Sequence, residues 1–219
     1  MPVIVGPILF LLALERGAAY ARDAAVYTLG AVFPAIVFGL AYAWTSRWRG
    51  WPLSLLAGYV AWLLAALALL AMPLKLDLAA LLALVTLFTA SWLYPRPAAA
   101  PKIGRLPRHE LGMRMLMGAV LTLAVTSLAQ MAAPGLSGLL ALFPVLSAIL
   151  AVFTHRSGGA DTVMTLLAAL AKGLWSLATF CLALPLLLDR TSIGIAFTES
   201  IAVALLVQAA LRSPRKAAS

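Results

Sequence analysis

Charged residues are scarce in this 219-residue chain: they make up 11% of it, whereas hydrophobic residues make up 64%. An ordinary soluble domain has about a quarter of its residues charged, which keeps its surface in water. The mean hydropathy of +1.03 lies far on the apolar side. Together these values exclude a soluble globular domain and predict an integral membrane protein.

Cysteine and histidine are almost absent. The chain has one cysteine, Cys181, and two histidines, His109 and His155. A single cysteine excludes an intramolecular disulfide, and no helical His/Glu ligand spacing predicts a metal site. The sequence also lacks a Ser-His-Asp arrangement, a paired-carboxylate site and a glycine-rich phosphate loop. We therefore expect neither an enzyme nor a cofactor.

Long apolar runs dominate the sequence. A membrane-spanning helix needs about 20 apolar residues, and the run 115–154 is about twice that length, so it must hold two spans with a turn at Pro134-Gly135. Counting the N-terminal segment as the first span, we expect an all-α transmembrane bundle of eight spans. A cleaved signal peptide is the alternative for that first segment, although no positive charge precedes its apolar run. The other apolar runs are 24–46, 50–74, 78–95, 162–188 and 192–211.

Basic residues are distributed unevenly among the expected loops. The chain has 16 Lys and Arg against 7 Asp and Glu, a net charge of +9. Eight spans place most of the basic residues in one set of loops, whereas the opposite loops are balanced, as at Asp189-Arg190. The positive-inside rule then places both termini in the cytoplasm of a bacterial inner membrane. The partner of this charge is the lipid bilayer and not nucleic acid, and we interpret the arginines as topology determinants.

A Phe-Pro pair occurs twice, as Phe33-Pro34 and as Phe143-Pro144. Gly/Pro-interrupted helices at matching places in two halves of a transport protein point to a binding site near the bilayer midplane. Pro34 and Pro144 are expected to bend their helices and free backbone carbonyls. Kinks that only improve packing are the alternative.

The spacing of the Phe-Pro pairs also predicts an internal duplication. Residues 26–47 align with residues 136–157, with both Phe-Pro pairs in register. We expect one four-span repeat at 1–95, a cytoplasmic Pro/Arg-rich linker at 96–110 and a second four-span repeat at 111–219. Because each repeat has an even number of spans, the two repeats are parallel.

The second half also carries a recognisable pattern over roughly residues 135–211. It combines a small-Leu-Leu-Ala-x-x-Pro run, a following Ser, a short polar turn and an aromatic-rich helix. Its residues are Gly138 to Pro144, Ser147, Leu150, Ser157-Gly158-Gly159, Trp175 and Pro185 to Leu188. This half resembles small four-span bacterial membrane proteins known only as a domain of unknown function. The resemblance implies a four-span architecture and no activity.

Three ionisable residues within or beside expected spans are candidate functional residues, because charge inside a bilayer is costly. Lys172 and Glu199 are expected near the midplane on neighbouring helices, where an ion pair would couple ionisation to conformation. The alternatives are a static buried pair or a snorkelling lysine. Glu15 superficially resembles the first-helix Glu with which small multidrug-resistance exporters exchange protons for cationic drugs, but the adjacent Arg16 would neutralise it.

Two functional hypotheses fit these observations. The first is a small transporter or permease that moves an unidentified small solute or a proton between its halves, with Phe33-Pro34, Phe143-Pro144, Lys172 and Glu199 as moving or coupling parts. The alternative is a non-transporting structural or accessory protein that packs against a partner, lipids or further copies of itself. An enzyme acting on lipid-linked substrates is disfavoured because the polar residues are few and scattered.

Overall fold

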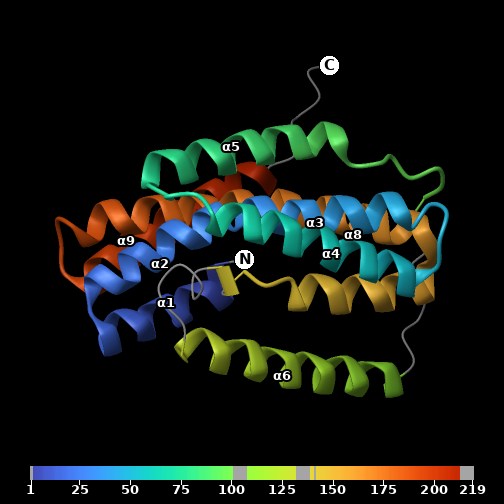
Figure 1. Cartoon of the computed structure of the whole chain (residues 1–219), viewed down its shortest axis with the longest axis horizontal. Coiled ribbons are helices and arrows are strands. Elements are labelled where there is room, and N and C mark those ends of the chain that lie inside the picture. The colour runs from blue at the N-terminus through green and yellow to red at the C-terminus, as the bar shows by residue number, and fades with distance from the viewer. Residues whose placement is uncertain (1, 101–107, 132–138, 141, 213–219) are drawn as a thin grey trace.

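A computed structural model describes residues 2–100, 108–131, 139–140 and 142–212 of the chain (Figure 1). These residues form helices and turns and no strand, so the all-α class is confirmed for them. The helices are α1 (Pro2–Arg16), α2 (Ala18–Gly30), α3 (Val32–Thr45), α4 (Trp51–Leu70), α5 (Leu76–Leu93), α6 (Arg108–Met131), α8 (Val145–Leu188) and α9 (Ile193–Arg212).

Five helical stretches in this part of the chain are long and apolar enough to cross a membrane. They are Ala18–Thr45, Trp51–Leu70, Leu76–Leu93, Val145–Leu188 and Ile193–Leu211. They are compatible with a multi-pass membrane protein, but the expected number of eight spans is wrong for the described residues. The first expected span is the 15-residue α1, which at 1.5 Å per residue covers only about 23 Å of a hydrocarbon core about 30 Å thick.

The expected sixth span is also shorter than the sequence suggested. For the expected fifth span, the apolar stretch of α6 among the described residues is Met115–Val125, and the expected turn at Pro134-Gly135 lies outside the described residues. The sixth span corresponds to the first arm of α8, residues 145–158, which is about 21 Å long. The expected sixth span is therefore not of full length in the described structure.

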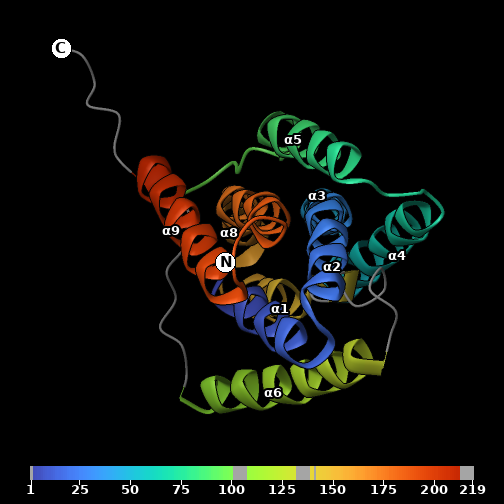
Figure 2. The same ribbon diagram turned by 90° about the vertical axis from the view of Figure 1, so that its left-hand side faces the viewer.

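Helix α8 consists of two arms that meet at Gly159. This glycine has φ 76° and ψ −174°, a left-handed conformation that residues with a Cβ rarely adopt. The chain turns back there, and the second arm, residues 160–188, runs through the centre of the bundle (Figures 1 and 2). The short polar turn that the sequence suggested at Ser157-Gly158-Gly159 is thus present, with its reversal at Gly159.

The two Phe-Pro pairs occupy different places relative to their helices. Pro34 lies in the first turn of α3, and the apolar stretch formed by α2 and α3 is interrupted at Ala31. Proline has no N–H to donate to the carbonyl four residues earlier, which explains an interruption at this point. Pro144 instead directly precedes Val145, the first residue of α8. The second pair therefore starts a helix, whereas we expected it to bend one.

Helices from both halves of the chain pack into one hydrophobic core. Figure 2 shows α2, α3 and α8 near the centre, with α4, α5, α6 and α9 around them. Helix α3 packs against α4, α5 and α8, while α2 packs against α1, α5 and α8. Leu29, Phe38, Leu87 and Leu177 are all buried in the same cluster. The two expected repeats, 1–95 and 111–219, thus share a core in the described residues.

One end of the bundle gathers the α3–α4 turn, the end of α5 and the Gly159 turn. The Trp44 indole N–H donates to the Leu93 carbonyl over 3.0 Å, and the Ala98 N–H donates to the Asp161 carboxylate over 2.8 Å. We call this the basic end, because its turns also carry Arg47, Arg49, Arg96 and Arg156.

The opposite end holds the α1–α2, α4–α5 and α8–α9 connections. Arg22 and Asp189 form an ion pair of 3.2 Å there, and the neighbouring Lys75 and Asp77 also balance each other in charge. Among the described residues, the structure therefore segregates the two sets of loops as the sequence predicted, with the basic surplus at one end.

Candidate functional site

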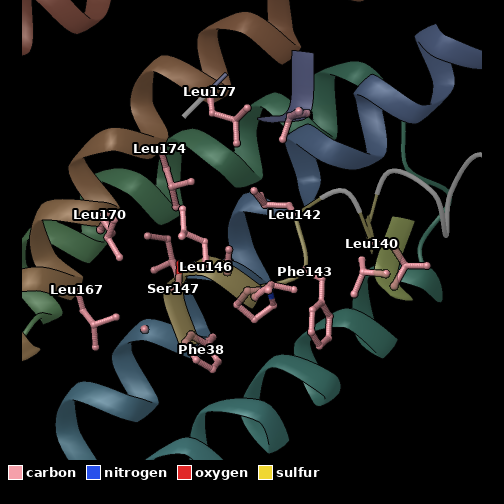
Figure 3. A pocket seen from close by; sticks show the side chains of 18 of the residues that line it. Phe38, Leu140, Leu142, Phe143, Leu146, Ser147, Leu167, Leu170, Leu174 and Leu177 are labelled. Carbon is pink, nitrogen blue, oxygen red and sulfur yellow. The ribbon is translucent and has the colours of Figure 1, made fainter. Parts of the chain in front are cut away.

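A central cavity of about 120 Å³ lies between α3 and α8, with α1 and α6 completing its wall (Figure 3). Its lining is almost wholly apolar. Leu167, Leu170, Leu174 and Leu177 recur at helical spacing along the second arm of α8 and form one side of it. Three polar side chains also contribute to the wall, and these are Tyr94, Thr122 and Ser147.

The second Phe-Pro pair lies directly on the central cavity, because Phe143 and Pro144 are both part of its wall. The first pair lies beside it. Pro34 is buried and Phe33 is half-buried, and the wall begins one residue later with Ala35 and continues through the following turn of α3. The structure thus brings the two sequence-predicted breaks to the same cavity, one as lining and one as the adjacent turn.

An aromatic cluster fixes the position of Phe143. Its ring stacks on Tyr59 with a centroid distance of 5.7 Å and meets Trp62 edge-on at 4.8 Å. Tyr59 in turn contacts Phe38 at 5.3 Å. Such pairs contribute about 0.5–1.5 kcal/mol each beyond their buried area. The cluster therefore ties the start of α8 to α3 and α4 and stabilises the cavity wall.

Gly39 and Tyr94 form the wall at the basic end of the cavity. A Cβ on Gly39 would meet the Tyr94 hydroxyl, so only glycine lets the phenol lie against α3. Burial raises the pKa of Tyr94, because the low-dielectric surroundings disfavour phenolate. The hydroxyl consequently stays protonated and uncharged beside the cavity.

A second pocket, of about 190 Å³, opens on the other side of Tyr94 between the end of α5 and the second arm of α8. We call it the basic groove, because two cationic side chains line it. Its lining residues are Leu87, Ala90, Ser91, Tyr94, Pro95, Arg96, Pro97, Ala168, Ala171, Lys172 and Trp175. Tyr94 and Ala171 belong to both linings, so the central cavity and the basic groove are separated by these two residues.

Lys172 and Glu199 do not form the ion pair that the sequence suggested. Both side chains are exposed, and the ion pair found among the described residues is Arg22–Asp189. The register of α8 and α9 explains the separation. The Ser176 hydroxyl donates to the Ala204 carbonyl over 2.8 Å.

The two helices are antiparallel, so that hydrogen bond sets Lys172 at the level of Gln208. Glu199 then lies about 14 Å farther along the helix axis, at 1.5 Å per residue. The expectation that Lys172 and Glu199 meet near the midplane is therefore not met in this structure. Lys172 lines the basic groove instead.

Glu15 also lies away from the cavity. It is exposed near the end of α1, next to the turn at Gly17, which has φ 90°. The neighbouring Arg16 donates to the Tyr20 hydroxyl over 3.3 Å and its guanidinium lies over the Tyr20 ring. Glu15 thus belongs to the charged turn between α1 and α2.

Sequence reasoning missed, among others, Phe38, Gly39 and Tyr94 of the site. A glycine in the middle of an apolar run was the available signal for Gly39, because small residues allow close approach between membrane helices. Phe38 and Tyr94 have no comparable signal, since each takes its role from neighbours far away in the sequence.

Among the described residues, no group of three His, Cys, Asp or Glu side chains is placed to hold a metal ion. Cys181 is buried as a free thiol. No protein-family model, no curated protein and no solved structure matches this chain.

Proposed function

We propose that this protein is a small transporter or permease of the bacterial inner membrane that binds a small, largely apolar solute in the central cavity. The observation that carries the proposal is the position of the cavity. It lies inside a bundle of apolar helices, beside Phe33-Pro34, which follow the interruption at Ala31, and against Phe143-Pro144. Breaks in apolar helices that face a shared cavity are typical of transporter binding sites.

The size and lining of the cavity define the solute class. An apolar cavity of about 150 Å³ lined by Leu, Ile and Phe holds benzene, and the cavity here has a comparable 120 Å³. Ser147, Thr122 and Tyr94 offer hydroxyl groups to one polar atom of a ligand. No charged side chain among the described residues lines it, so a small aromatic or aliphatic molecule with one hydroxyl or amine is favoured over an ion.

Further parts of the proposal concern topology. The segregated charge at the two ends of the bundle supports a basic end that faces the cytoplasm, with both termini on that side. The two Phe-Pro pairs, 110 residues apart in the sequence, support a parallel duplication of a four-helix unit. Assembly into a homo-oligomer is compatible with the many apolar side chains exposed on α4, α5 and α9.

The binding step is tested by thermal unfolding of the purified protein in detergent against a panel of small aromatic and aliphatic alcohols and amines. A ligand at about a hundred times its dissociation constant stabilises by about 2.7 kcal/mol. The variant Ala35→Leu places a larger side chain in the cavity wall and should abolish that shift. Ala202→Leu, on the exposed face of α9, is the matched control and should retain it.

The transport step is tested with the same ligand in reconstituted liposomes. Flux that Ala35→Leu removes and Ala202→Leu retains would support the transporter. A ligand that binds in the cavity without flux would favour the accessory protein, in which the same cavity anchors a partner or a lipid. If no small molecule produces a shift that depends on Ala35, the central cavity is only a packing void and the proposal fails.

A further inference from the structure

Among the described residues that line it, the basic groove contains two positive charges and no negative one. Arg96 and Lys172 both line it and both side chains are exposed, whereas none of the other lining residues is acidic. Like charges that share a groove with apolar walls repel each other more strongly than they would in water. An anion bound between them would relieve that repulsion.

No protein carboxylate supplies this negative charge in the described structure. Neither Arg96 nor Lys172 forms an ion pair there, since the pair found among the described residues is Arg22–Asp189. The acidic residue at the same end of α8 is Asp161, and its carboxylate accepts the Ala98 N–H over 2.8 Å. Arg96 and Lys172 can therefore pair with an anion from outside the described protein residues.

The groove lies at the depth of lipid headgroups if the bundle spans a membrane. It opens where α5 ends at Leu93, in the same region as the exposed Trp92 and the Trp44 indole that bonds to Leu93. Tryptophan is enriched at this interface. Lys172 lies deeper on α8, but side chains tilt toward the N-terminus of their helix. Its ammonium can therefore reach toward the basic end, as snorkelling lysines do.

The walls of the groove suit the rest of a lipid molecule. Leu87 and Ala90 form apolar walls on the α5 side, deeper than Arg96, and Ala168 lies on α8 one turn nearer the basic end than Lys172. Trp175 closes one side and is itself held edge-on against Phe88 with a centroid distance of 4.8 Å. A headgroup bound by the cations would thus leave its acyl chains along an apolar surface.

We propose that the basic groove binds the phosphate of an anionic phospholipid, held by Arg96 and Lys172 between α5 and the second arm of α8. Arginine forms paired hydrogen bonds with phosphate oxygens, and lysine adds a point charge. A lipid phosphate is favoured over free phosphate because apolar walls continue on the α5 side, deeper than Arg96. This site is separate from the central cavity and does not depend on transport.

The test uses the purified full chain in a neutral detergent, titrated with short-chain phosphatidylglycerol and, in a second arm, with inorganic phosphate. The variant Arg96→Gln/Lys172→Gln removes both groove cations. Each basic residue near an anionic surface contributes about fivefold in affinity, so the phosphatidylglycerol affinity should fall about twenty-fivefold. The control Arg47→Gln/Arg49→Gln removes the same charge from the same end outside the groove and should leave the binding curve nearly unchanged.

The outcomes separate the ligand sources. The lipid site is supported if phosphatidylglycerol binding depends on the groove cations and inorganic phosphate competes with it only weakly. Groove-dependent binding of inorganic phosphate alone supports the phosphate contacts and overturns the lipid assignment. Equal losses in both double variants indicate diffuse attraction and overturn the site. If the groove variant does not fold, the variant Arg96→Lys/Lys172→Arg is used instead, because it keeps both charges. If neither this folded variant nor the wild-type chain binds phosphatidylglycerol, the proposed site is overturned as well.

Discussion

The substitution Gly39→Ala tests whether Tyr94 forms the wall between the central cavity and the basic groove. The added Cβ would meet the Tyr94 hydroxyl, whereas the next ring atoms, Cζ and Cε1, lie at 3.4 and 3.8 Å, ordinary contact distances. Overpacking of this kind costs about 1–3 kcal/mol. Alanine in a helix recovers about 1 kcal/mol relative to glycine, so we expect a net destabilisation of about 0–2 kcal/mol.

The Tyr94 hydroxyl can be removed separately by Tyr94→Phe, so a double-mutant cycle tests whether it contacts position 39. In a Tyr94→Phe background the clash is absent, so Gly39→Ala should stabilise the protein by about 1 kcal/mol. The two substitutions should therefore couple by about 1–3 kcal/mol. The measurement is unfolding in mixed micelles of all four proteins, with Gly112→Ala as a control, because no atom lies within 4 Å of a Cβ at that position.

A coupling energy near zero would refute this argument. It would mean that Gly39→Ala acts in the same way with and without the phenolic oxygen, so that the two residues do not touch in the folded protein. The division of the interior into an apolar cavity and a basic groove would then lose its structural basis, because Tyr94 is one of the two residues that line both pockets.

Two further substitutions test the packing of α8 and the charged end opposite the basic end. Ser176→Ala should lower the free energy of unfolding by about 0.6 kcal/mol, a typical value for a hydrogen bond between membrane helices, because the Ser176 hydroxyl donates to Ala204 across the α8–α9 interface. Ser200→Ala is the control, since that hydroxyl bonds within its own helix; equal losses in an unfolding titration would contradict the assigned register. Asp189→Asn should change stability by less than about 1 kcal/mol and lose that effect at high salt, because the side chains of Arg22 and Asp189 are 51% and 48% exposed. A larger, salt-independent loss would show that the pair is buried.

The all-α class and the unequal charge of the two ends of the bundle could be predicted from the sequence, because both depend on local composition. Apolar runs of about 20 residues form helices wherever they lie, and charged turns collect at the ends of those helices. The eight-span count failed because run length alone does not reveal where a helix begins and ends. Helix α8 begins only at Val145, so its first arm is short when the chain turns back at Gly159, and α1 stops at 15 residues.

The candidate site was predictable only where proline marks it. Phe143-Pro144 was found because proline interrupts a helix regardless of its neighbours, and the structure places this pair on the cavity wall. Phe38 and Tyr94 carry no such local mark. They reach the cavity through packing between α3, α5 and α8, which no pattern within a single helix determines.

The placement of Lys172 shows why depth along a helix does not identify a partner. Counting residues from the helix ends gave Lys172 and Glu199 similar depths, and a shared depth suggested an ion pair. Pairing also requires a common register and facing sides, and the Ser176–Ala204 hydrogen bond sets a register that separates the two charges. Lys172 faces the end of α5 instead, where Arg96 is also cationic. Because the charged neighbour of Lys172 among the described lining residues has the same sign, we proposed an external anion and not an internal acid as its partner.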